Sequence, residues 1–129
     1  MITITRLYEA EGSSSNNIDE KNEVRILVDR LWPRGLSKDR VKMSLWLKDI
    51  APSDKLRKWF SHDPKKWEQF KKRYKEEIMK DNNRIELLRQ IKKIEKEKGS
   101  VILLYSAKDK EHNNAVALKE FLSEPGLQL

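Results

Sequence analysis

Residues 101–105 read Val-Ile-Leu-Leu-Tyr, an uninterrupted apolar run in a chain of which 38% of the residues are charged. Such a run is typical of a strand buried on both faces, as in a parallel sheet covered by helices. Residues 24–29, Val-Arg-Ile-Leu-Val-Asp, have a similar apolar density and predict a second central strand. Residues 2–8 alternate apolar and polar side chains, which predicts a third strand with one buried face.

Helical patterns occupy the middle of the chain. Asp63 is placed to cap a helix that has Pro64 in its first position, and Gly99 stands where the C-terminal cap of a later helix belongs. Between them, apolar residues recur at helical spacing and predict two helices. These residues are Trp67, Phe70, Tyr74, Ile78, Ile85, Leu88, Ile91 and Ile94.

Shorter helices are expected on both sides of this segment. We expect one helix over about residues 39–49, ended by Pro52, and another over residues 53–60 with Ser53 as its N-cap. A last helix begins at about Glu111 and buries apolar side chains that include Leu118.

Strands separated by helices predict an α/β fold: a small, mostly parallel β-sheet flanked by helices, with a helix-rich middle segment. The 129 residues suit a single α/β domain, so we expect one domain over residues 1–129. Residues 9–22 are polar and rich in Ser and Asn, and we expect a poorly ordered surface loop there.

The composition excludes several classes of protein. Without cysteine there is no disulfide scaffold, thiol nucleophile or Cys-ligated zinc site, and with two histidines a dedicated transition-metal site is not expected. Four glycines form neither a P-loop nor a dinucleotide fingerprint, and no cofactor is indicated. No apolar stretch approaches the roughly 18–20 residues of a membrane span. The first residues read as a strand rather than a signal peptide, so we expect a cytoplasmic protein.

Two polar segments directly follow the predicted central strands. Asp29-Arg-Leu-Trp-Pro-Arg-Gly35 follows one strand, and Ser106-Ala-Lys-Asp109 follows the other. If the strands are parallel neighbours, both segments meet at the carboxyl edge of the sheet, where ligands bind in open α/β sheets. Guanidinium and ammonium groups beside the N-terminus of the last helix would form a site for an anion. The candidate ligand-binding residues are Arg30, Trp32, Arg34, Ser106 and Lys108.

This edge also holds the candidates for catalysis. Asp29 or Asp109 could orient a ligand hydroxyl or act as a base, and His112 is a candidate general base by its location. Trp32 either forms a wall of the site or packs over the sheet edge. The alternative for the whole group is a structural cluster in which the aspartates neutralise the arginines. An antiparallel pairing of the strands would separate Arg34 from Lys108 and remove the site.

The positive charge is concentrated in residues 51–98, which hold 16 Lys and Arg against 9 Asp and Glu, while the net charge of the whole chain is +7. Such a segment suits an acidic partner such as nucleic acid, although Lys-rich helices often only have solvated faces. The aromatic residues of this segment share the buried stripe, so its lysines would bind phosphates without reading sequence.

A series of motifs in this chain resembles the YeaO-like family, part of a larger grouping of domains of unknown function. The motifs are D-R-L-W-P-R-G (29–35), W-L-K-D-I-A-P-S (46–53), L-R-K-W-F-x-H-D-P (56–64), W-x-x-F-x-x-R-Y (67–74) and L-L-Y-S-A-K-D (103–109). The resemblance implies a compact α/β domain and no particular activity. Some members of the larger grouping have cysteines and a Cys-His-Arg segment, where this chain has Tyr105 and Asn113-Asn114-Ala115. Their thiol chemistry is therefore not expected here.

Three functions are compatible with the sequence. The first is binding, with or without chemical conversion, of a phosphorylated or nucleotide-like small ligand at the strand ends. The second is association with nucleic acid through residues 51–98. The third is protein interaction without a small ligand.

Overall fold

The computed structural model describes residues 1–7, 23–37 and 43–125. Its four strands are β1 (Ile2–Arg6), β2 (Glu23–Leu27), β3 (Leu45–Trp46) and β4 (Ser100–Tyr105). Its helices are α2 (Asp54–Phe60), α3 (Trp67–Met79), α4 (Asn82–Lys98) and α5 (Asn114–Leu122), with 3-10 turns over Lys48–Ile50 and Pro64–Lys66. The expected loop over residues 9–22 lies outside the described residues.

The strands form one parallel sheet in the order β1-β4-β2-β3. The prediction of a small α/β fold is confirmed. The two central strands are parallel neighbours, with Ile26 opposite Leu103, so the condition on which the candidate site depends is met. Residues 29 and 106 therefore leave the sheet at the same edge, as the candidate site requires. None of the helices in the described part of the chain has the length and apolar content needed to cross a bilayer.

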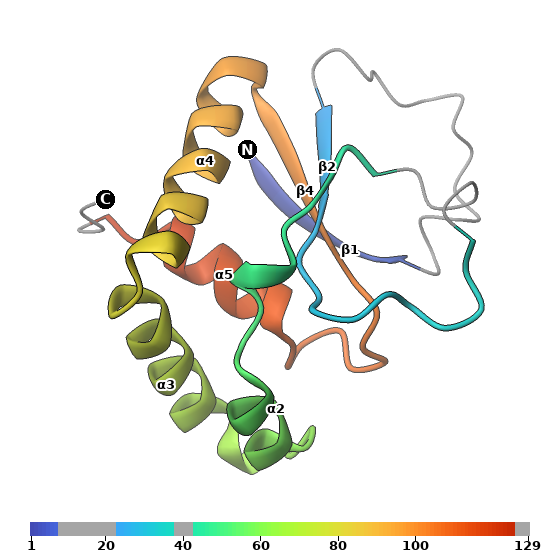
Figure 1. Cartoon of the computed structure of the whole chain (residues 1–129), viewed down its shortest axis with the longest axis vertical. Coiled ribbons are helices and arrows are strands. Elements are labelled where there is room, and N and C mark those ends of the chain that lie inside the picture. The colour runs from blue at the N-terminus through green and yellow to red at the C-terminus, as the bar shows by residue number, and fades with distance from the viewer. Residues whose placement is uncertain (8–22, 38–42, 126–129) are drawn as a thin grey trace.

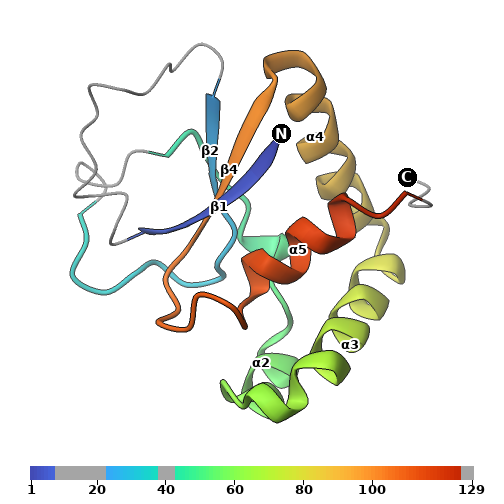
Figure 2. The same cartoon turned by 180° about the vertical axis from the view of Figure 1, so that it is seen from behind.

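Alternation along the strands divides the apolar residues between the two faces of the sheet. On one face Ile26, Val101 and Leu103 join the main core with residues of the helices. Figures 1 and 2 show α4 and α5 on this side of the sheet, with α3 continuing below α4. On the other face Leu27 and Leu104 are fully buried in a second, smaller cluster. The central strands are thus covered on both faces, which explains why most of their residues are apolar.

The helix predicted over residues 39–49 is wrong in its second half. Leu45–Trp46 is the edge strand β3, and residues 38–42 lie outside the described residues. Ser44 N–H donates to the Arg25 carbonyl (2.7 Å) and Leu47 N–H to the Leu27 carbonyl (2.9 Å), so pairing with β2 outweighs the local helical pattern.

The predicted helix ends are mostly correct. Ser53 and Asp63 each accept a backbone hydrogen bond as N-caps, and Gly99 ends α4 with a φ of 90°. Asp81, for which no cap was predicted, is the N-cap of α4. The last helix begins later than expected, at Asn114, because the side chain of Asn113 accepts from Val116 N–H (3.0 Å) and forms the cap.

Candidate functional site

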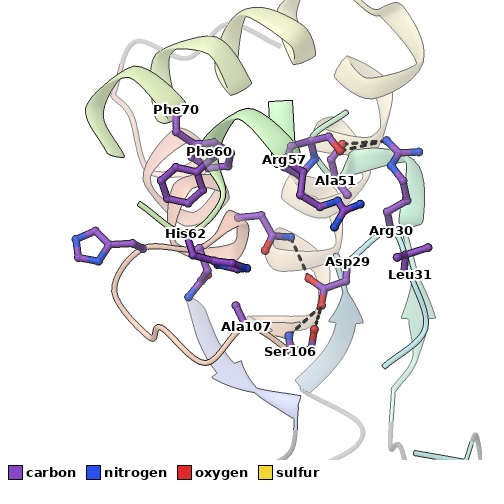
Figure 3. Close-up of a pocket in the computed structure, with 14 residues that line it drawn as sticks. Asp29, Arg30, Leu31, Ala51, Arg57, Phe60, His62, Phe70, Ser106 and Ala107 are labelled. Carbon is purple, nitrogen blue, oxygen red and sulfur yellow. Dashed lines mark hydrogen bonds between the residues drawn. The ribbon is translucent and has the colours of Figure 1, made fainter. Parts of the chain in front are cut away.

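A cavity of about 220 Å³ lies at the carboxyl edge of the sheet, between the ends of β2 and β4, the N-terminus of α5 and the helix α2 (Figure 3). Open α/β sheets bind ligands at this edge. Its polar lining comes from Asp29, Arg30, Arg57, His62, Ser106, His112, Asn113 and Asn114, and its apolar lining from Leu31, Ala51, Pro52, Phe60, Phe70 and Ala107.

Three hydrogen-bond donors hold the Asp29 carboxylate in place, two from Ser106 after β4 and one from Asn114 at the start of α5. Its Oδ2 accepts from Ser106 N–H (2.9 Å) and Ser106 Oγ–H (2.7 Å), and its Oδ1 accepts from Asn114 Nδ2 (3.1 Å). Asn114 Nδ2 also donates to the Val28 carbonyl (2.9 Å), which ties the first turn of α5 to the end of β2. Burial raises the pKa of the Asp29 carboxyl, and these hydrogen bonds partly oppose that rise.

Two guanidinium groups line the cavity. Arg30 Nη2 lies 3.3 Å from the Ala51 carbonyl and 3.4 Å from the Pro52 carbonyl, while Arg30 Nε is buried without a hydrogen-bond partner. Arg57, on α2, uses Nη2 for Asp54 Oδ1 (3.0 Å) and extends toward Asp29 in Figure 3. Both guanidinium groups therefore have further N–H groups that could donate hydrogen bonds to an anion.

Two imidazoles lie at the same cavity. Nδ1 of His112 is 2.9 Å from Asp109 Oδ2, and Asp109 Oδ1 accepts from the backbone N–H groups of Glu111 and His112. These hydrogen bonds lower the pKa of Asp109, whose charged form orients the His112 ring. His62 follows α2 in a left-handed conformation, with a φ of 57°.

Aromatic rings form the apolar wall opposite Asp29 (Figure 3). Phe60 and Phe70 are stacked with ring centroids 4.3 Å apart. The rings of Trp67 and His112 meet edge to face, with their centroids 5.3 Å apart. Phe60 and Phe70 are both buried, so this wall belongs to the main core and is rigidly packed.

The structure brings four of the candidates from the sequence to the cavity: Asp29, Arg30, Ser106 and His112. Asp109 is the partner of His112. The lining does not include Trp32, Arg34 or Lys108. Trp32 packs against Trp46 with ring centroids 5.4 Å apart, and its Nε1 donates to the Leu36 carbonyl (2.6 Å), on the side of the second apolar cluster. Arg34 and Lys108 are exposed.

Sequence reasoning missed Arg57, His62 and Asn114. In the sequence, His62 directly precedes the helix-capping Asp63, and Arg57 is one of many basic residues of the 51–98 segment. The N-cap Ser53 fixes the start of α2 and thereby the face that carries Arg57, but only the tertiary fold brings this helix to the strand ends. Within the described part of the chain no group of three or more His, Asp or Glu residues could hold a metal ion.

Comparison with known proteins identifies the family. A family profile described as "Inactive DUF488-N3 subclade" matches residues 1–128, which is nearly the whole chain. The chain belongs to this family. It is 36% identical over 104 residues to the uncharacterised protein YeaO of Escherichia coli, covering 81% of this chain and 87% of YeaO. The resemblance to YeaO-like proteins is therefore confirmed.

Mycobacterial proteins match a shorter part of this DUF488-N3 chain. Uncharacterised proteins of Mycobacterium tuberculosis and Mycobacterium bovis are 40% identical to it over 77 residues, or 60% of this chain. The match spans 59% of the length of these relatives. No solved structure matches the chain.

Proposed function

We propose that this protein binds a small phosphorylated or nucleotide-like anion in the cavity at the strand ends. The observation that carries the proposal is the gathering of two guanidiniums and two imidazoles around one cavity at the carboxyl edge of a parallel sheet. Such groups hold phosphate oxygens by charge-assisted hydrogen bonds. The description of the subclade as inactive favours binding without chemical conversion.

The pairing of the charges supports this proposal over a structural ion-pair cluster. Among the described residues Asp29 is satisfied by Ser106 and Asn114 and forms no ion pair with an arginine. The Arg30 guanidinium donates to two backbone carbonyls. Among the described residues it forms no ion pair with a carboxylate.

The basic helices give less support to nucleic-acid binding. Lys71 pairs with Glu68 (3.3 Å) and with Glu120 of α5 (3.1 Å), and Lys75 pairs with Glu124. These ion pairs use part of the positive charge of α3 to attach α5. A short oligonucleotide nevertheless belongs in the ligand panel, since binding through the lysines would fall steeply with salt.

The test is a thermal-shift and calorimetry panel at fixed low salt with inorganic phosphate, sugar phosphates, nucleotides and an oligonucleotide. A ligand at 100 times its Kd stabilises the folded protein by about 2.7 kcal/mol, which shifts the Tm by several degrees. We expect a shift from one class of small phosphorylated compounds that persists when salt is raised moderately.

Arg57→Gln is the informative variant, because the chain offers a closely matched control. Arg57 and Arg89 have side chains 50% and 52% exposed, and each pairs at 3.0 Å with an acid three residues earlier. Arg57→Gln should weaken binding about ten-fold or more, as expected for a hydrogen bond to a charged group. Arg89→Gln, on α4 away from the cavity, should leave it unchanged. Equal affinities for both variants, or no shift with any small anion, would refute the proposal.

A further inference from the structure

The cavity contains an aspartate among its cationic groups, and this narrows the class of ligand. We propose that the ligand carries, besides its phosphate, a hydroxyl group that donates a hydrogen bond to Asp29. This inference rests on the proposed function, because it assumes that the phosphate lies in the same cavity.

Asp29 disfavours a bare anion. A carboxylate near a phosphate repels it, and the reduced solvent screening at the half-buried Asp29 strengthens the repulsion. Arg30 and Arg57 can hold the phosphate, but the floor of the cavity at Asp29 needs a ligand group that donates rather than accepts. A ligand with a hydrogen-bond donor a few bonds from its phosphate can place the phosphate at the two arginines and the donor at Asp29.

The hydrogen bonds of Asp29 leave room for one such donor. A carboxylate offers about four acceptor positions, two on each oxygen. Both positions of Oδ2 are used by the N–H and the hydroxyl of Ser106, and one position of Oδ1 is used by Asn114. The remaining position is on Oδ1. Because the occupied positions fix the carboxylate plane, this acceptor is oriented before the ligand arrives.

A hydroxyl fits this acceptor better than an ammonium group. An ammonium has three N–H donors, and the open position on Asp29 accepts only one of them. The Ala51 and Pro52 carbonyls already accept from Arg30, and the Ser106 and Ala107 carbonyls from Arg6, so each has at most one lone pair left. Unsatisfied donors in a buried site are unfavourable, and the two guanidiniums would repel a cation. A hydroxyl needs only one acceptor and carries no charge.

Three probes separate these possibilities: propyl phosphate, glycerol 3-phosphate and phosphoethanolamine. The first two have the same three-carbon chain and differ in the hydroxyl groups. We expect the wild-type protein to bind glycerol 3-phosphate about ten-fold more tightly than propyl phosphate, by calorimetry or NMR titration. Phosphoethanolamine should bind more weakly than glycerol 3-phosphate.

Asp29→Asn tests the residue itself. With its carbonyl oxygen on Ser106, the new side chain presents an NH₂ group in place of Oδ1 and removes the negative charge. The preference for glycerol 3-phosphate should therefore fall to about two-fold or less, while the affinity for propyl phosphate stays equal or rises. A variant that merely misfolds would lose both ligands. Arg89→Gln, on α4 away from the cavity, is the control and should keep the preference.

The outcomes separate this inference from the proposed function. Equal binding of propyl phosphate and glycerol 3-phosphate by the wild type, sensitive to Arg57→Gln, would overturn the hydroxyl contact and leave the anion site intact. Tighter binding of phosphoethanolamine would overturn it in favour of an ammonium donor. If neither these probes nor any member of the anion panel binds, both proposals fail together.

Discussion

Replacing Tyr74 by Phe removes one oxygen atom that links α3 to the rim of the cavity. The Tyr74 side chain is completely buried, and its hydroxyl donates to the carbonyl of Ile50 at 2.6 Å. Ile50 directly precedes Ala51 and Pro52, the residues whose carbonyls hold Arg30. The ring itself packs against Phe70 and Phe121, and a phenylalanine would preserve these contacts.

The size of the effect follows from this geometry. The variant creates no large cavity, so its cost is the lost hydrogen bond and the buried carbonyl that loses its donor, together about 1–3 kcal/mol. For a domain of this length the entropy of unfolding near the Tm converts that range into a decrease of about 4–11 °C. Urea denaturation and calorimetry of Tyr74→Phe measure both quantities. A change below about 0.5 kcal/mol would refute the reasoning, because the bond would then contribute no more than a typical surface contact.

The pH dependence gives an independent check. Burial raises the pKa of the Tyr74 hydroxyl well above its usual 10.0, so the folded state keeps this proton at a pH where the unfolded chain loses it. The free energy of unfolding of the wild type should therefore fall as the pH rises above 10.0, and this contribution should be missing in Tyr74→Phe. Parallel alkaline profiles would show that the phenol is not shielded.

Two further predictions concern the end of α4 and the acids of the site. Gly99→Ala should destabilise the protein by about 1–2 kcal/mol in urea denaturation, because the φ of 90° is unfavourable for alanine while no atom lies within 4 Å to clash; an unchanged stability would contradict this. In an NMR titration of the carboxyl carbons, Asp29 should titrate above 3.8 and Asp109 below it, each for the reason given above. By linkage, Asp29 then reduces stability as the pH rises above 3.8, whereas the stabilising contribution of Asp109 is present above 3.8 and is lost as the pH falls through its lowered pKa. The reverse order of the two midpoints would contradict both assignments.

The sheet could be predicted because its central strands have a simple requirement. Residues 24–28 and 101–105 are covered on both faces, so nearly every position needs an apolar side chain and the pattern is visible in the sequence. β3 has no such pattern. It is two residues long and pairs with β2 on one side only, so Leu45 and Trp46 fit a helical stripe equally well.

The candidate site could be predicted only in part, because chain position fixes where a residue leaves the sheet but not where its side chain points. Asp29, Arg30 and Ser106 stand directly at the strand ends and reach the cavity. Trp32 lies only a few residues further and is held on the other side by the Leu36 carbonyl. Arg57 comes from a helix whose docking depends on the core around Phe60, which no local pattern reveals.

Under the proposed function, the surplus of basic residues and the cavity would contribute to anion binding at different ranges. Exposed lysines on α3 and α4 create a positive field that attracts anions over about a Debye length, roughly 8–10 Å at ordinary salt, and this field mainly speeds association. Arg30 and Arg57 would act at contact distance beside the half-buried Asp29, where hydrogen-bond geometry controls dissociation. A positive chain therefore does not by itself indicate nucleic acid as the partner, since the same field serves a small phosphate. In the proposed site, the arrangement of donors and the single remaining acceptor at Asp29, rather than the net charge, would select the ligand.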